Sequence, residues 1–150
     1  MKIFIKNFDE NFNQELDSQL KRDSFFIANL ELSTLLLNND ANYPWLILVP
    51  RIEFAYDLTD LEILNQNILI NEINICANFL KENFVVDKLN IASLGNVVRQ
   101  LHVHIIARQK IDLTFPKPVW GNAQIKPYQI NQAQEIIKNI QQFLIKNAKS

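Results

Sequence analysis

The sequence predicts an α+β domain in which an antiparallel sheet carries one long helix between its strands and a second helix at its C-terminal end. Short apolar runs alternate with clusters of turn-forming residues, a pattern typical of strands. Residues 60–83 and residues 131–148 instead repeat apolar side chains at steps of three and four, as amphipathic helices do. Because the strands come in runs rather than in regular alternation with helices, this order favours an α+β fold over a doubly wound one.

The composition is that of an ordinary globular chain, and we expect one domain spanning residues 1–150. A chain of 150 residues can bury about two thirds of the surface that its unfolded form exposes. The formal net charge is −1, from 15 basic and 16 acidic residues, and no long basic run is present. We therefore expect no nucleic-acid partner, and we expect any bound phosphate to be held by local contacts.

The N-terminal residues and the single cysteine indicate the compartment. The first ten residues carry charges and lack the apolar core of a signal peptide, and no stretch approaches the roughly 18 apolar residues of a membrane span. Cys76 has no second cysteine to pair with and falls on the apolar side of the helix expected over residues 60–83, where it packs in the core. We expect a cytoplasmic protein without a membrane partner.

The first part of the chain is expected to contribute a short helix and two strands. Residues 10–24 are polar with a few spaced apolar positions, as in a short surface helix. Apolar runs at residues 30–37 and 45–49 are each interpreted as one strand, with turn-forming residues between them. Pro50 cannot donate a hydrogen bond to a neighbouring strand, so the second strand should end there.

The helix expected over residues 60–83 begins with a capping signal. Thr59 and Glu62 have the spacing of a capping box, in which each side chain accepts a hydrogen bond from the backbone amide of the other residue. The apolar side of this helix consists of Leu61, Leu64, Ile68, Ile75 and Phe79, and the opposite side carries Asn67, Asn71, Asn74, Asn78 and Lys81.

The second half of the chain is expected to contain two strands and the final helix. The strands are residues 88–92 and 98–107, with a turn at Gly95 and Asn96 between them. A proline-rich loop leads to the helix over residues 131–148, which Asn131 and Gln134 are spaced to cap. Its apolar stripe consists of Ala133, Ile136, Ile137, Ile140, Phe143 and Leu144.

The rarest residue types gather in one segment. The chain has two histidines, His102 and His104, and two glycines, Gly95 and Gly121, and all four lie within 27 positions. Alternation with period two puts Gln100 on the same strand face as both histidines, while the apolar residues between them face the long helix. A polar row is costly on an apolar face, so we expect these side chains on a surface or in a cleft.

Three interpretations of this face remain open from the residues alone. The first is a solvent-facing strand that carries two histidines without a function. The second is a metal site, because His-x-His can chelate one ion, although the local sequence offers only Asp112 as a further ligand. The third is an enzyme site with His102 as nucleophile. There Nδ1 would donate to the carbonyl two residues earlier, Nε2 would attack, and the turn of residues 95–97 would offer amides to an anion.

Residues 95–106 resemble the motif of the histidine triad (HIT) superfamily. The segment is Gly95-Asn96-Val97-Val98-Arg99-Gln100-Leu101-His102-Val103-His104-Ile105-Ile106, and the motif is His-φ-His-φ-His-φ-φ with φ hydrophobic, preceded by a Gly-Gln/Asn phosphate turn. The resemblance extends to Trp45-Leu-Ile-Leu-Val-Pro50 and Pro118-Val-Trp-Gly121, and it covers about residues 25–125. The chain is most similar to a bacterial group of HIT-domain proteins that carries Gln-Leu-His-Val-His.

The resemblance implies an α+β fold built on a five-stranded antiparallel sheet, usually dimeric, that binds purine nucleotides. It implies that His102 attacks the α-phosphate and forms a nucleotidyl-histidine, which water or another acceptor resolves. His104 would contact the phosphate and the bridging or leaving oxygen, and the amides of Gly95, Asn96 and Val97 would bind the phosphate. Neither a cofactor nor a metal is implied.

Three positions depart from the family pattern or align poorly with it. Gln100 replaces the first histidine, and if that position serves through its backbone carbonyl, the nucleophile keeps its orientation. Trp45 stands where several relatives have a further histidine, so help to the leaving group is expected to be weaker or to come from elsewhere. The ribose-binding residue is expected among Asn38, Asn39 and Asp40, with Asn39 favoured.

We expect a nucleotide hydrolase or nucleotidyl transferase that cleaves a phosphoanhydride or phosphoramidate bond at the α-phosphate. The substrate is a nucleoside phosphoramidate, a dinucleoside polyphosphate or an adenylylated metabolite. The alternative is a purine-nucleotide-binding module that kept the pocket and lost efficient turnover. A homodimer is expected from the resemblance and from the apolar surface of residues 60–83. Trp120 either covers the mouth of the site or fills the core, and Arg108 either attracts phosphate or is solvated.

Overall fold

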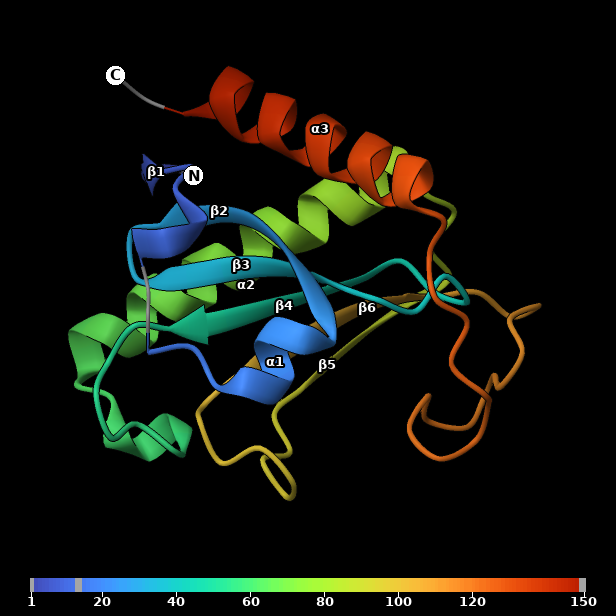
Figure 1. Ribbon diagram of the computed structural model, residues 1–150, viewed down its shortest axis with the longest axis horizontal. Coiled ribbons are helices and arrows are strands. Elements are labelled where there is room, and N and C mark those ends of the chain that lie inside the picture. The colour runs from blue at the N-terminus through green and yellow to red at the C-terminus, as the bar shows by residue number, and fades with distance from the viewer. Residues whose placement is uncertain (1, 13–14, 149–150) are drawn as a thin grey trace.

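The computed structural model describes residues 2–12 and 15–148 and shows an α+β fold built on a six-stranded sheet (Figure 1). Neighbouring strands are antiparallel and follow the order β1-β2-β3-β4-β6-β5. The strands are β1 (Ile5–Asn7), β2 (Ser24–Leu30), β3 (Ser33–Asn38), β4 (Trp45–Pro50), β5 (Lys88–Ala92) and β6 (Val103–Arg108). Because β6 inserts between β4 and β5, the strand that carries the histidines lies inside the sheet.

Two long helices and three short helical segments accompany the sheet in the described part of the chain. The long helices are α2 (Ile63–Asn83) and α3 (Ile130–Asn147), and the short segments are α1 (Ser18–Arg22) and the 3-10 turns η1 (Glu10–Phe12) and η2 (Leu58–Asp60). No helix among the described residues has the length and apolar character that crossing a bilayer requires.

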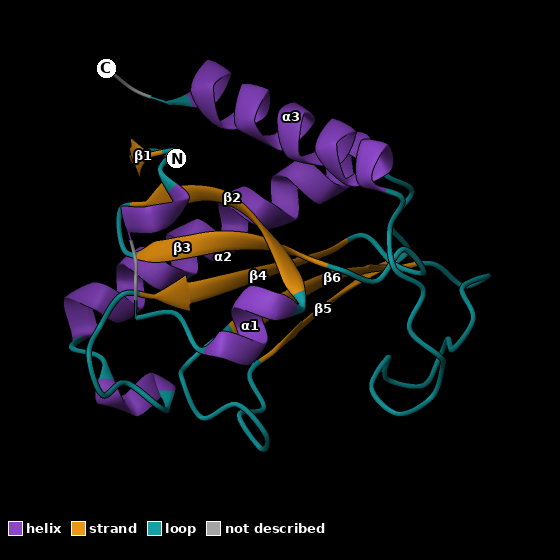
Figure 2. Cartoon of the chain, viewed as in Figure 1, coloured by secondary structure: helices purple, strands orange, loops and turns teal. Residues whose placement is uncertain are grey.

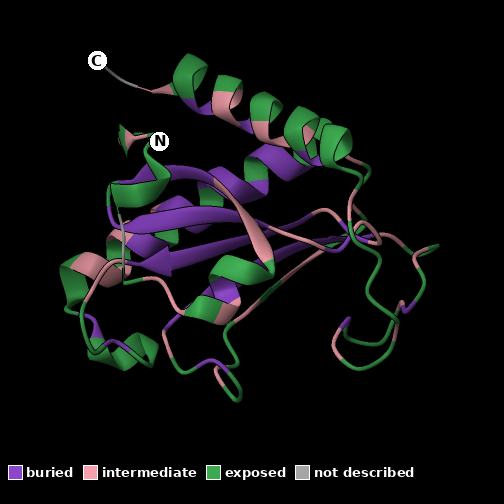
Figure 3. Cartoon of the chain, in the orientation of Figure 1, coloured by how far each residue is buried: buried purple, intermediate pink, exposed green. Residues whose placement is uncertain are grey.

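The sheet separates two apolar clusters, one on each face. Figure 2 shows α2 behind the strands and α1 in front of them. The larger cluster joins one face of the sheet to α2 and α3, and it contains Leu101 and Ile105 together with Cys76. The smaller cluster lies on the other face and contains Leu20 of α1 and Ile106 of β6. The central strands are therefore buried from both sides (Figure 3).

The interpretation of residues 30–37 as one strand was wrong, because the chain turns back at Glu31 and Leu32. β2 ends before this turn and β3 begins after it, and the two strands pair as a hairpin. The buried carboxylate of Glu72 in α2 accepts hydrogen bonds from the amides of Leu32 and Ser33, at 2.8 and 3.2 Å. Burial raises the pKa of Glu72. A helix distant in sequence therefore holds this turn.

The expected starts of the two long helices were off by three residues for α2 and by one residue for α3. The capping box before α2 is formed by Asp57 and Asp60 around η2, whereas Thr59 lies inside that turn and α2 begins at Ile63. α3 begins at Ile130 after Gln129, rather than after Asn131. The helix expected over residues 10–24 is reduced to η1 and α1, and residues 13 and 14 lie outside the described chain.

The apolar stripes of the two long helices are largely confirmed. Ile75, Cys76 and Phe79 are fully buried, whereas Leu64 in the first turn of α2 is 69% exposed. In α3 the buried residues are Ala133, Ile140 and Leu144, and the partly buried ones packed against the core are Ile136, Ile137 and Phe143. Periodicity thus predicted the buried faces of both helices correctly, except in the first turn of α2.

The sheet has six strands rather than the five expected, because β1 pairs with the edge of β2. β5 has the bounds expected of it, and β4 ends at Pro50 as expected. The histidine strand is shorter than the expected 98–107, since residues 98–102 run outside the sheet before β6 begins at Val103. His102 therefore lies just before the strand and His104 within it.

Candidate active site

A pocket of about 660 Å³ opens on the sheet face that carries the smaller apolar cluster. One wall is formed by α1 and the start of β2, and the opposite wall by the histidine segment, the turn before it and the segment around Trp120. The floor includes Trp45 and Ile47 of β4. The pocket is thus built from elements that are far apart in the sequence.

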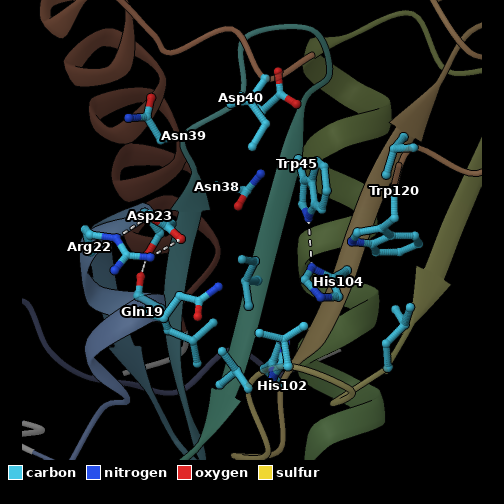
Figure 4. A pocket seen from close by; sticks show the side chains of 18 of the residues that line it. Gln19, Arg22, Asp23, Asn38, Asn39, Asp40, Trp45, His102, His104 and Trp120 are labelled. Carbon is cyan, nitrogen blue, oxygen red and sulfur yellow. Dashed lines mark hydrogen bonds and ion pairs between the residues drawn. The ribbon is translucent and has the colours of Figure 1, made fainter. Parts of the chain in front are cut away.

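Both histidines lie in the pocket wall. His102 is 6% exposed and His104 is 7% exposed, and both line the pocket. Figure 4 shows Trp45, His104 and His102 following one another along this wall. Leu101, Val103 and Ile105 point into the larger core on the other side, as the alternation predicts. The interpretation of a solvent-facing strand is therefore wrong.

The backbone carbonyl of Gln100 fixes the tautomer of His102. Nδ1 of His102 lies 2.6 Å from that carbonyl oxygen. A carbonyl can only accept, so Nδ1 carries the proton and donates it. Nε2 is left with its lone pair and makes no hydrogen bond within the described residues. This is the arrangement that a nucleophilic imidazole requires.

Trp45 fixes the opposite tautomer of His104. The indole Nε1–H of Trp45 donates to Nδ1 of His104 at 2.9 Å. Since an indole can only donate, Nδ1 of His104 carries the lone pair and Nε2 carries the proton. Burial, together with the neighbouring His102, lowers the pKa of His104 to about 3. His104 is therefore a neutral N–H donor.

The side chain of Gln100 is not part of the pocket lining. Its Oε1 accepts from the amide of Asp17 at 2.8 Å, and its Nε2 donates to the carbonyl of Glu15 at 3.3 Å. Asp17 caps α1 by accepting from the amide of Gln19. Gln100 thus turns its carbonyl toward His102 and uses its carboxamide to anchor the segment that leads into α1.

The turn over Gly95, Asn96 and Val97 also lines the pocket. Gly95 has a φ of 70°, a left-handed conformation that favours glycine. Within the described residues, none of the three backbone amides makes a hydrogen bond. Free amides of successive residues can together bind an anion, as the sequence led us to expect of this turn.

Residues 38–40 form the far end of the pocket. Oδ1 of Asn39 accepts from the amide of Tyr128 at 2.9 Å, and Oδ1 of Asp40 accepts from the amides of Asn42 and Lys126. Both side chains thereby tether the loop before α3. The carboxamide of Asn38 makes no hydrogen bond within the described residues and points into the pocket (Figure 4).

Several pocket residues were not among the expected site residues. They are Gln19, Leu20, Arg22, Asp23 and Ser24 in and between α1 and β2. Asn38 was one of the three residues considered for the ribose, and it follows the same alternation that turns Leu36 toward the smaller cluster. No local sequence signal places α1 beside the pocket, because the position of α1 depends on tertiary contacts.

Arg108 lies away from the pocket, in a buried cluster. It makes two hydrogen bonds with the carboxylate of Asp112, at 2.8 and 3.0 Å, and it also binds Asn90 and Thr114. Burial alone would raise the pKa of Asp112, but Arg108 and three backbone amides lower it to about 2. Both suggested roles of Arg108 were therefore wrong, and Asp112 is engaged by Arg108. The described residues contain no group of three or more His, Cys, Asp or Glu side chains arranged to hold a metal.

Trp120 is half-buried and packs edge-on against Trp45 and His104, with ring centroids 5.6 and 5.1 Å apart. It lines the pocket as well, so it both fills space beside the histidines and bounds the cavity. No hydrogen bond joins Trp120 to His104 in the described structure, in contrast to Trp45.

The geometry of these residues agrees with a comparison against protein families. The model of the HIT domain matches residues 19–111, more than half of the chain. The chain belongs to the HIT family. Members of this family typically have the fold of nucleotide-binding hydrolases or transferases, and residues 19–111 include the pocket walls from α1 to β6.

Solved structures of bacterial HIT proteins have the same fold. A histidine triad protein from Bradyrhizobium japonicum is 45% identical, with a TM-score of 0.84 over 87% of this chain and 97% of that chain. One from Sinorhizobium meliloti is 39% identical, with a TM-score of 0.82 over 88% of this chain and 95% of that chain. One from Marinobacter aquaeolei is 35% identical, with a TM-score of 0.85 over 89% of this chain and 98% of that chain. Among curated proteins, no sequence matches the chain significantly.

Proposed function

We propose that this HIT protein is a nucleotide hydrolase or nucleotidyl transferase that cleaves a phosphoanhydride or phosphoramidate bond at the α-phosphate. The observation that carries this proposal is the hydrogen bond between Nδ1 of His102 and the carbonyl of Gln100, at 2.6 Å. It leaves Nε2 of His102 unprotonated in the wall of a pocket large enough for a nucleotide.

The proposed reaction has two displacement steps. First, the lone pair on Nε2 of His102 bonds to the α-phosphorus, and the bond to the leaving group breaks with its electron pair on the leaving group. The imidazole gains a positive charge, which the Gln100 carbonyl stabilises through Nδ1–H. Water then attacks the phosphorus, the P–N electron pair returns to Nε2, and one water proton passes to solvent. In a transferase another acceptor takes the place of water.

The remaining site residues are proposed to bind the nucleotide. His104 would donate its Nε2 proton in a hydrogen bond to the phosphate or bridging oxygen, and the amides of Gly95, Asn96 and Val97 would bind the other phosphate oxygens. Asn39 remains our proposal for the ribose, through the amide group that its bond to Tyr128 leaves free. The purine would lie toward α1.

The second candidate is a purine-nucleotide-binding module with little turnover. One observation favours it: Trp45 replaces a family histidine and holds His104 as a neutral donor. The pocket would still bind a nucleotide in this case, but the leaving group would receive no proton from His104.

Incubation with a diadenosine polyphosphate and with a fluorogenic adenosine phosphoramidate tests the proposal. Release of a nucleoside monophosphate from either substrate supports the enzyme. Binding measured by calorimetry without release supports the module, and neither binding nor release contradicts both. A stoichiometric metal in protein purified without added metal would instead support a metal-binding function. A homodimer and a cytoplasmic location remain expectations from the family resemblance and the sequence.

A further inference from the structure

The contact between Trp45 and His104 decides what His104 can do with its proton. The indole Nε1–H occupies Nδ1 of His104, so the one proton on the imidazole sits on Nε2. To give that proton away and stay neutral, the ring must first take up a second proton at Nδ1. The Trp45 N–H already points at that nitrogen from 2.9 Å, so a proton there would face another proton.

Aromatic side chains packed around Trp45 and His104 hold these two residues in place. Trp45 and His104 are each 7% exposed, and their rings pack edge-on with centroids 5.5 Å apart. Tyr43 packs against the Trp45 ring, and Trp120 packs against both rings of the pair. Since the indole is enclosed on several sides, it cannot swing away to free Nδ1 without disturbing the smaller core. The packing of these rings therefore keeps His104 in the tautomer that carries its proton on Nε2.

Among the described residues, the pocket lining offers no substitute proton donor beside His104. Its other titratable lining residues are Arg22, Asp23, Asp40 and His102. Arg22 and Asp23 form an ion pair with each other on the opposite wall (Figure 4). The carboxylate of Asp40 accepts hydrogen bonds from two backbone amides at the far end of the pocket. His102 is the proposed nucleophile, and its proton is committed to the Gln100 carbonyl.

We propose that His104 acts as a hydrogen-bond donor and not as an acid, and that the pocket therefore acts on nucleotide conjugates whose leaving group departs as a stable anion. This inference rests on the proposed function and narrows its substrate class. Phosphates and carboxylates leave with the electron pair of the broken P–O bond and need no proton, so the His104 N–H only has to stabilise their charge. An amine leaving from a P–N bond has to be protonated as it departs. Phosphoanhydrides and acyl phosphates of nucleotides are thus substrates, and phosphoramidates are poor ones.

Two adenosine conjugates of nearly equal size test this directly. Adenosine 5′-fluorophosphate loses fluoride, a stable anion, whereas adenosine 5′-phosphoramidate loses ammonia and requires a proton. The kcat/KM of the wild-type protein should be about a thousandfold higher for the fluorophosphate than for the phosphoramidate. This is the typical contribution of a general acid, which the phosphoramidate needs and His104 does not supply. Uncatalysed rates of both compounds, measured in parallel, correct for their intrinsic reactivity. A ratio within about tenfold would overturn the proposal.

Removal of the indole N–H provides the complementary variant. Trp45→Phe keeps an aromatic ring but frees Nδ1 of His104, so phosphoramidate turnover should rise at least about tenfold relative to fluorophosphate turnover. Trp120→Phe is the matched control, because Trp120 packs on the same imidazole without a hydrogen bond to it, and it should leave that ratio unchanged. An unchanged ratio in Trp45→Phe would contradict the proposal.

The tautomer itself has a readout that does not depend on activity. Nitrogen-15 NMR of the histidine rings should show His104 protonated at Nε2 alone, and still neutral at about pH 5, where an ordinary histidine is charged. A charged ring, or a proton on Nδ1, would overturn the inference even if the enzyme hydrolyses nucleotides. If neither conjugate is hydrolysed, and a diadenosine polyphosphate is not hydrolysed either, the proposed function fails, and the leaving-group preference fails with it. The NMR result then still decides the state of His104, including where Trp45→Phe does not fold.

Discussion

The backbone carbonyl oxygen of Gln100 lies 2.6 Å from Nδ1 of His102, while the side-chain Oε1 of the same residue accepts a hydrogen bond from the amide of Asp17 at 2.8 Å. Gln100 thus orients the candidate nucleophile with its backbone, and its side chain anchors the segment that leads into α1 on the opposite wall. The first position of the triad motif therefore does not need an imidazole to orient His102. It needs a backbone whose carbonyl points inward, and Gln100 provides one.

Gln100→His should change the turnover rate by no more than about tenfold, equivalent to about 1.4 kcal/mol, because the carbonyl that orients His102 stays in place. Gln100→Ala, which also keeps the carbonyl but removes the bonds to Glu15 and Asp17, should raise KM more than it lowers kcat. Steady-state kinetics of the three proteins would check this. A thousandfold gain in Gln100→His would show that the missing imidazole limits the rate.

Asp112→Asn should destabilise the fold by about 3–5 kcal/mol, because it leaves the buried guanidinium of Arg108 without a counter-charge. Their side chains are 2% and 8% exposed. The matched control is Asp23→Asn, which breaks the exposed pair with Arg22 and should cost far less stability because solvent screens that pair. Urea unfolding measures both. Equal losses in the two variants would show that the Arg108 cluster contributes no more than a surface pair.

The folded protein should lose stability as the pH falls from about 6.5 toward 3, in part because of His104. The pKa of His104 is lowered to about 3 in the folded state, so only the unfolded chain binds a proton there between these values. The contribution of His104 is complete above about pH 6.5, and its loss has a slope of up to about 1.4 kcal/mol per pH unit. Urea unfolding of wild type and His104→Gln across this range should show a shallower slope in the variant. Parallel curves would mean that His104 titrates normally.

Sedimentation at micromolar concentration should show a dimer with twice the chain mass of 17.5 kDa. Most apolar residues of α2 are buried against the sheet, and Ile70, at 53% exposure, remains available for a partner. Ile70→Asp should dissociate the dimer before it unfolds the chain. The control is Asn78→Asp on the exposed asparagine stripe, which should leave the dimer intact if that stripe faces solvent. A wild-type species of 17.5 kDa that still binds nucleotide would reject the dimer.

The parts of the fold that could be predicted from the sequence are those with a local periodic signal. The long helices and β5 repeat their apolar residues regularly enough to be read directly. The turn between β2 and β3 falls inside residues 30–37, and it is held by Glu72, which lies 40 positions after Leu32. No local pattern encodes such a contact, so these residues were interpreted as one strand.

The same distinction applies to the candidate site. The shared face of His102 and His104 follows from alternation along one segment, so both were expected in the pocket that they line. The bond from Trp45 to His104 depends on the register of β4 against β6, in which Trp45 pairs with Ile106 and Ile47 with His104. That register is set by the folded sheet. The role of Trp45 therefore became visible only in three dimensions.

The central claim is that His102 forms a bond to the nucleotide, and intact-protein mass spectrometry tests it most directly. The protein should be mixed with a nucleotide conjugate, quenched in alkaline denaturant because a nucleotidyl-histidine is acid-labile, and then digested to locate the adduct. We predict the added mass of one nucleotidyl group on His102. His102→Ala should lack the adduct and lose turnover by at least about 10⁴-fold, while its circular dichroism spectrum should match that of the folded wild type. An adduct on another residue, or wild-type turnover in His102→Ala together with its loss in His104→Ala, would contradict the account.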